Sequence, residues 1–173
     1  VYGSTDYRHP AVEILQENGS RITDFRYEGY EITEGKPELK GLPATYTESG
    51  KEAKTLKIFL RDGLTGCRLE LLYTIFASEA AVARSACLRN EGSENLHLLT
   101  AMSLNLDLPD KDYIWMQLSG AWARERYVKK RILEQGITAV DSRRGNSSHE
   151  QNPFVALKRS NATEGAGEVI GIS

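Results

Sequence analysis

A recurrence of apolar side chains at every second position is the feature that most constrains the fold of this chain. Apolar residues recur at every second position from Leu56 to Leu60, and the same period of two runs from Cys67 to Ile75. Because successive side chains of a strand point to opposite faces, each segment predicts a half-buried β-strand. Between them, Asp62-Gly63-Leu64-Thr65-Gly66 supplies glycines where a hairpin loop needs positive φ. Together the segments predict an antiparallel hairpin.

Similar signals recur along the chain. Val82 to Arg89 continues the pattern, and Asn90-Glu91-Gly92-Ser93 turns the chain into Leu96 to Leu108, which predicts a second hairpin. Ile22 to Ile32 alternates with a change of phase at Gly29, which predicts a strand bent by a β-bulge. Many short strands separated by turns favour an all-β fold, a large antiparallel β-sandwich.

One segment, Ala121 to Leu133, has a composition that favours a helix. It is rich in Ala, Arg, Glu and Lys, and a helix would bring Trp122, Val128 and Ile132 close to one face. The flanking segments are strand-like, however, and the context of a sheet can override local propensity. We therefore predict a long strand or a strand and loop here, not a regular helix.

Length and charge limit the classes of function. The 173 residues and 19.3 kDa fit one domain of ordinary globular composition. A formal net charge of -2 creates no field that would attract nucleic acid or an anionic membrane. Arg124 to Arg131 is locally basic, but Glu125 interrupts it, as is typical of a solvated strand or loop. Nucleic acid and membranes are therefore not expected as partners.

Cysteine content and hydropathy address the compartment. Cys67 and Cys87 are expected to be buried free thiols, because secreted domains that depend on disulfides carry more cysteines. No apolar run approaches the roughly 18 to 20 residues of a membrane span. Val1 to Pro10 is also unlike a signal peptide. The sequence therefore predicts a soluble, cytoplasmic protein.

Histidines offer no convincing metal site. His149-Glu150 resembles the start of a zinc-protease motif, but Pro153 stands where the second histidine should be. His9, His97 and His149 lie in unrelated contexts, so satisfied core or surface histidines are the favoured interpretation. No metal and no cofactor are expected.

Nucleophiles and paired carboxylates are equally unconvincing. Ser147-Ser148-His149 lacks the strand-turn-helix setting that activates a serine, and a polar loop explains it. Asp107, Asp110 and Asp112 flank Pro109, and both residue types suit turns. A retaining glycosidase would need two carboxyl groups about 5 to 5.5 Å apart across a cleft. No catalytic residue is assigned to this chain.

Two polar segments remain unusual for a simple scaffold, residues 119–126 and residues 141–154. The first places Trp122 among small residues, where an indole could stack on the apolar face of a sugar ring. The second is rich in groups that hydrogen-bond hydroxyls. The residues alone also allow Trp122 to be an anchor of the core or of a subunit interface.

Long ordered motifs in these same segments give the chain a resemblance to a known family. It resembles the amino-terminal domain of bacterial α-galactosidases of glycoside hydrolase family 36, over nearly all 173 residues. The motifs that carry the resemblance are LSGAWARER at 118–126, SRRG at 142–145, NPF at 152–154, YGSTDYRHPA at 2–11, SRITDFRY at 20–27 and GLPATY at 41–46.

The resemblance implies a β-sandwich of the supersandwich kind that precedes a (β/α)₈ barrel. It implies a retaining enzyme for terminal α-galactosides such as melibiose or raffinose-type oligosaccharides, usually a homotetramer, with both catalytic aspartates in the barrel. In this chain it singles out Trp122 as a substrate-binding residue at the edge of the sugar site. A further acidic sugar contact of the family would precede Val1.

Two classes of function follow. Residues 1–173 are expected to be a non-catalytic domain that assembles the oligomer and completes a glycosidase site, with the parent continuing beyond both ends. The alternative is a stand-alone carbohydrate-binding module, which would usually expose several aromatic side chains as a platform, whereas the Gly-Ala-Trp motif offers one. We predict that the isolated chain has no α-galactosidase activity.

Overall fold

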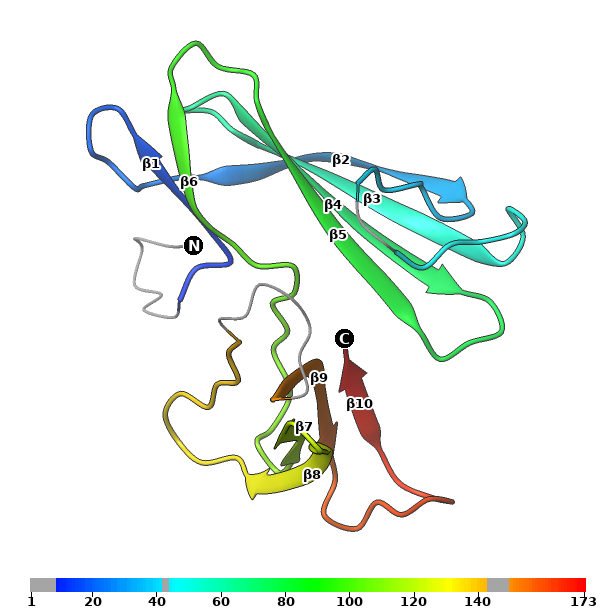
Figure 1. Cartoon of the computed structure of the whole chain (residues 1–173). Helices are drawn as coiled ribbons and strands as arrows, with labels where there is room; N and C mark the ends of the chain where they lie inside the picture. The colour runs from blue at the N-terminus through cyan, green and yellow to red at the C-terminus, as the bar shows by residue number, and fades with distance from the viewer. Residues whose placement is uncertain (1–8, 42–43, 143–149) are drawn as a thin grey trace. The chain divides into compact units, whose positions relative to one another are not determined.

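The computed structural model describes residues 9–41, 44–142 and 150–173, which form ten strands and no helix. All strand pairings are antiparallel, so the predicted all-β fold class is confirmed (Figure 1). The chain divides into two compact units, Val1–Leu106 and Asp107–Ser173. In the described part of the chain, no helix has the length and apolar character needed to cross a membrane.

Six strands belong to the first unit and four to the second. The first six are β1 (Val12–Gln16), β2 (Phe25–Glu34), β3 (Ala53–Asp62), β4 (Cys67–Phe76), β5 (Val82–Asn90) and β6 (Leu96–Ala101). The remaining four are β7 (Ile114–Ala121), β8 (Arg124–Ile132), β9 (Gln151–Lys158) and β10 (Val169–Ile172).

The first unit contains a twisted four-stranded sheet in the order β2-β3-β4-β5 (Figure 1). The predicted β3–β4 hairpin is confirmed, and the buried side chain of Asp62 organises its loop. Its carboxylate accepts hydrogen bonds from the Leu64 N–H at 3.2 Å and the Thr65 hydroxyl at 2.7 Å. Cys67, on β4, is buried and Cys87, on β5, is half-buried, and both are free thiols as expected.

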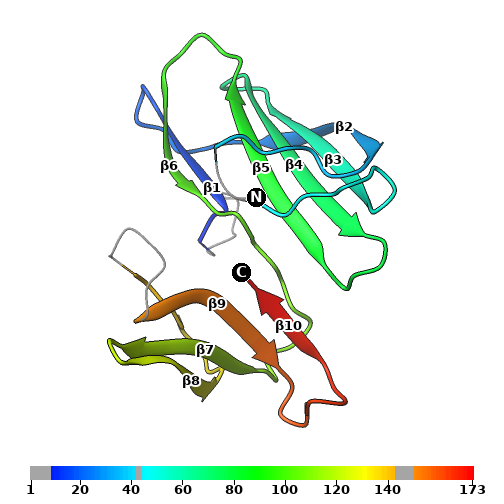
Figure 2. The same cartoon turned by 45° about the vertical axis from the view of Figure 1, so that its right-hand side comes forward.

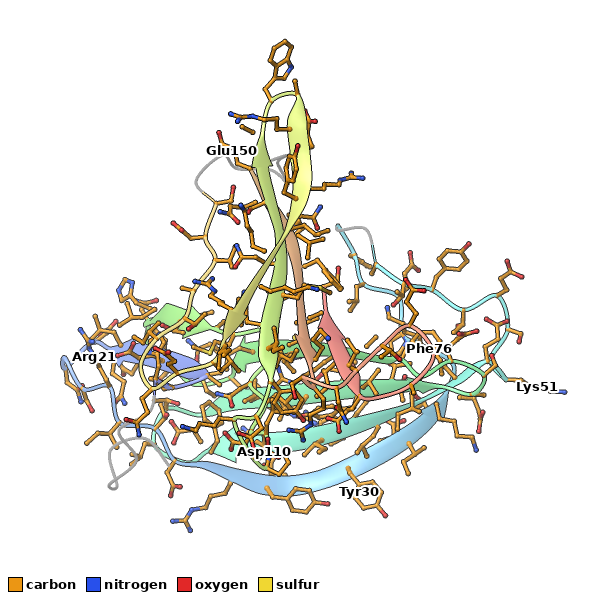
Figure 3. All side chains as sticks on the ribbon, turned by 90° about the horizontal axis from the view of Figure 1, so that it is seen from below. Arg21, Tyr30, Lys51, Phe76, Asp110 and Glu150 are labelled. Atoms are coloured by element: carbon orange, nitrogen blue, oxygen red, sulfur yellow. The ribbon has the colours of Figure 1, made fainter. Side chains whose placement is uncertain are left out.

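β2 confirms the predicted bend, because its register with β3 shifts between Tyr27 and Gly29. The strand begins at Phe25, three residues later than the alternation from Ile22 indicated. β2 is an edge strand, and its Tyr30 is 64% exposed and points outward in Figure 3.

The predicted second hairpin is wrong. β5 pairs with β4, whereas β6 pairs with β1 in a separate two-stranded sheet. The turn forms, since Asn90 Oδ1 accepts from the Gly92 N–H at 3.1 Å, but it leads the chain out of the sheet. Gly92 lies so close to the β3–β4 loop that a Cβ on it would be 2.1 Å from the Thr65 carbonyl oxygen.

The alternation at 104–108 forms no strand, because Asp107-Leu108-Pro109 ends the extended run with a residue that cannot donate a backbone hydrogen bond.

The second unit is a four-stranded sheet in the order β10-β9-β7-β8 (Figure 2). Residues 124–132, whose composition favours a helix, form β8, so the prediction against a helix is confirmed. β8 is exposed along its whole length, as expected for the basic run. Phe154 to Leu157 lies within β9, whereas 136–140 forms no strand.

Four residues of the second unit, Asp110, Tyr113, Arg159 and Glu168, form a cluster of hydrogen bonds and ion pairs, called the latch below. The guanidinium of Arg159 binds both carboxylate oxygens of Asp110, at 2.5 and 3.1 Å, and lies 3.9 Å from the ring centre of buried Tyr113. The Tyr113 hydroxyl donates to Glu168 at 2.5 Å, and the Asp112 N–H donates to Asp110 at 2.9 Å. Asp110 and Asp112 therefore serve the turn and the latch, in agreement with their structural interpretation.

Candidate functional site

Trp122 occupies the tip of the β7–β8 hairpin. Ala121 pairs with Arg124, so Trp122 and Ala123 form a two-residue turn between the strands. The side chain of Trp122 is 83% exposed, which overturns the interpretation of this residue as a core anchor. An indole in this position is available to a ligand or to another subunit.

The backbone of this tip is constrained. Ala123 has φ 61° and Arg126 has φ 58°, in the left-handed region that residues with a Cβ rarely adopt. Glu125 braces the turn, because its Oε1 accepts a hydrogen bond from the Ala123 N–H at 2.7 Å. Strain of this kind persists only where neighbouring contacts fix the conformation, and it concentrates at functional sites.

Gly120 permits the close approach of the two strands at the tip. A Cβ on Gly120 would lie 2.0 Å from the carbonyl oxygen of Arg124, where the register of β7 and β8 shifts. The Gly120 N–H also donates to the Glu150 carbonyl at 3.0 Å and so joins the hairpin to the start of β9. Figure 3 shows Glu150 beside the hairpin.

A groove of about 1030 Å³ lies beside the hairpin. It brings together the two polar segments that the sequence singled out, residues 119–126 and 141–154. The lining residues are Ser119, Gly120, Ala121, Arg124, Tyr127, Lys129, Asp141, Ser142, Glu150 and Gln151. Residues 143–149, including Arg143, Arg144 and His149, lie outside the described residues.

A hydrogen-bond network centred on buried Gln117 lies on the same face of the sheet as the groove. Gln117 Oε1 accepts from the Trp115 indole at 2.8 Å and from Arg131 at 2.6 Å. Its amide nitrogen donates to Gln151 Oε1 at 3.3 Å, so the network reaches a residue that lines the groove. Because Gln117 itself is buried, this network fixes the side chains next to the groove.

The described residues contain no group of three or more His, Cys, Asp or Glu side chains arranged to hold a metal ion. His9 lies before β1 and His97 lies on β6, in the first unit, away from the hairpin tip in sequence and in sheet. The described side chains that line the groove can form hydrogen bonds and, at Tyr127, an aromatic contact. Such groups suit the binding of a polar organic ligand.

Comparison with protein families identifies this architecture. A model described as the glycosyl hydrolase family 36 N-terminal domain matches residues 1–173. The chain belongs to this family.

Similar proteins agree with the family assignment. The chain is 51% identical over 173 residues to α-galactosidase AgaA of Geobacillus stearothermophilus, covering 100% of this chain and 24% of that protein. It is 38% identical over 171 residues to α-galactosidase Mel36A of Lactobacillus acidophilus, covering 99% of this chain and 23% of that protein. The family 36 chain therefore spans about a quarter of the length of these relatives.

Solved structures give the same result. The crystal structure of AgaA matches with a TM-score of 0.96 at 50% identity, over 99% of this chain and 24% of AgaA. The α-galactosidase of Lactobacillus brevis matches with a TM-score of 0.94 at 42% identity, over 99% of this chain and 23% of that protein. Variants of AgaA have been crystallised in complex with raffinose and with stachyose.

The sequence did not single out two residues of the groove in this family 36 chain, Tyr127 and Lys129. Both lie in the locally basic run and in the segment whose composition favours a helix. Their spacing of two, on a segment flanked by strands, was the available signal, because it places them on one face of a strand.

Proposed function

We propose that this chain is the amino-terminal, non-catalytic part of a retaining α-galactosidase that hydrolyses terminal α-D-galactosides of the melibiose and raffinose type. The 51% identity to AgaA over the whole chain is the observation that carries this proposal. Complexes of AgaA variants with raffinose and stachyose support the substrate class. Homo-oligomer assembly, as a tetramer, and a cytoplasmic location belong to the same proposal.

Within that enzyme, Trp122 is proposed to form the edge of the sugar-binding site. Galactose presents an apolar face of C–H groups on which an indole packs, while its hydroxyls require polar partners. The exposed indole stands on a braced turn, and such preorganisation lowers the entropy lost on binding. Exposure and bracing both support a ligand contact.

Trp122→Ala in the full-length enzyme tests this role. We expect kcat/KM for galactosides to fall roughly 5-fold to 150-fold, because one aromatic contact is lost. This corresponds to a loss of about 1 to 3 kcal/mol of transition-state stabilisation. If the indole contacts substrate and transition state alike, KM rises and kcat is unchanged; a fall in kcat would place the contact in the transition state. Trp122→Phe keeps an aromatic face and should lose less.

Thermal unfolding and sedimentation are measured beside the kinetics. An exposed tip residue should leave the melting temperature unchanged. A Trp122→Ala enzyme that keeps its kcat/KM while dissociating into smaller species would contradict the sugar contact and make Trp122 an interface residue. The stand-alone binding module would be favoured instead if the polypeptide lacked a barrel and the chain alone bound galactosides.

A further inference from the structure

One row of side chains forms the floor of the groove and crosses three strands. Tyr127 on β8 lies opposite Ser119 on β7, and Ser119 lies opposite Gln151 on β9. Directly paired residues share a face of a sheet, so these three side chains point to the same side. With neighbouring strands about 4.8 Å apart, the row is roughly 10 Å long.

Lys129 extends this face by one row, because it lies two residues from Tyr127 and opposite Gln117. Tyr127 is 56% exposed, so its side chain is accessible to a ligand. Among residues 9–41, 44–142 and 150–173, the side chains of Ser119, Tyr127 and Lys129 have no hydrogen-bond or ion-pair partner. The floor therefore offers an aromatic surface and unused polar groups together.

The charges of the groove point to a neutral ligand. Among the lining residues that the structure describes, Arg124 and Lys129 contribute positive charge, and Asp141 and Glu150 contribute negative charge. A site built for an anion would concentrate one sign. The cationic side chains of this lining can instead donate hydrogen bonds to the hydroxyl oxygens of a neutral ligand.

We propose that this groove is a second saccharide-binding subsite, with Tyr127 as its stacking surface and Ser119 and Lys129 as hydrogen-bonding partners. Its volume, about 1030 Å³, lies just above the range of about 300 to 1,000 Å³ for small-molecule sites, which leaves room for more than one ring. The ligand is a neutral oligosaccharide. The choice of galactosyl oligosaccharides, with Trp122 contacting the terminal galactose, rests on the proposed function.

Titration of the 173-residue chain by NMR, with stachyose and with methyl α-galactoside, tests the subsite. The described lining comes from the second unit alone, so stachyose should bind the isolated chain and perturb the amide signals of Ser119, Tyr127 and Lys129. Tyr127→Ala should weaken stachyose binding by about 2-fold to 10-fold, less than the loss expected for Trp122→Ala because a phenol ring offers a smaller stacking surface than an indole. Methyl α-galactoside has a single ring and should bind more weakly than stachyose. The Tyr127→Ala change should leave the affinity for methyl α-galactoside unchanged.

Tyr30→Ala is the matched control, because Tyr30 is 64% exposed and lies on β2 in the first unit. It should not change either affinity. Lys129→Met removes the ammonium group while keeping the length of the side chain, and it should also weaken stachyose alone. Both groove variants replace exposed side chains and should retain the wild-type spectrum elsewhere.

Separate results overturn the subsite and the proposed role of Trp122. Absence of stachyose binding at saturating concentration, or equal affinity in wild type and Tyr127→Ala, overturns the subsite. Loss of methyl α-galactoside binding in Tyr127→Ala also overturns it, because the residue would then belong to the galactose site. If Tyr127→Ala weakens stachyose binding while Trp122→Ala changes the affinity for neither ligand, the subsite is supported and the proposed role of Trp122 is contradicted.

Discussion

The backbone conformation of the hairpin tip around Trp122 depends on the absence of a side chain at Gly120. Gly120 has no Cβ, which lets the Arg124 carbonyl approach its backbone, and Ala123 adopts a backbone angle that a glycine would accept more readily. The carboxylate of Glu125 accepts a hydrogen bond from the N–H of that same residue. A side chain presented on this turn keeps its direction, as a stacking contact requires.

Gly120→Ala should destabilise the chain by about 1 to 3 kcal/mol, because the new methyl group would lie 2.0 Å from the Arg124 carbonyl oxygen and the strands would have to separate. Urea denaturation followed by circular dichroism measures the change in unfolding midpoint. Gly29→Ala is the control, since no atom lies within 4 Å of the position that its new methyl group would take. An equal midpoint for both variants would show that the hairpin tip tolerates the methyl group.

Elements of the second unit are joined by the latch as well as by the sheet. Arg159 follows β9, Glu168 precedes β10, and Asp110 and Tyr113 precede β7, so the latch ties three strand ends together. The guanidinium of Arg159 holds the pKa of Asp110 below its usual range, and the Asp112 N–H adds to this effect. The ionised form of Asp110 is therefore favoured in the folded state.

This shift predicts the pH dependence of stability. A carboxyl whose folded pKa is lowered stabilises the protein above its unfolded pKa of roughly 3.9, and the contribution disappears as pH falls through the folded pKa. The wild type should therefore exceed Asp110→Asn in stability at neutral pH, and the difference should shrink on acidification. Urea midpoints across pH measure it. Glu164→Gln, which removes a charge from the β9–β10 turn without touching Arg159, should show no such narrowing.

The sequence predicted those elements whose evidence is local. Alternation and loop glycines were enough for the β3–β4 hairpin, and the phase change at Gly29 was enough for the bulge in β2. The pairing of β1 with β6 joins residues 80 to 89 positions apart, from Gln16 with Leu96 to Val12 with Ala101, and no local periodicity encodes such a pairing. Tyr127 joined the candidate site only when the order β9-β7-β8 placed it in one row with Ser119 and Gln151.

At the scale of the whole molecule, the chain covers 24% of AgaA and belongs to an N-terminal domain family. A β-sheet unit with an exposed aromatic tip and a polar groove can bind and orient a saccharide. Cleavage is a separate requirement, because a retaining glycosidase needs one carboxylate as nucleophile and a second carboxyl group as acid and base. We place that pair in the barrel of the proposed full-length enzyme.

The isolated chain should therefore bind saccharides without hydrolysing them. Incubation with a nitrophenyl α-galactoside should release nitrophenol at the rate of buffer alone, whereas AgaA under the same conditions provides the positive control. Binding energy alone gives no turnover, because cleavage by a retaining glycosidase requires a nucleophile to attack the anomeric carbon and an acid to protonate a sugar leaving group. Activity that co-purifies with the chain and scales with its concentration would contradict the assignment. It would then require two carboxylates of this chain to act as the catalytic pair.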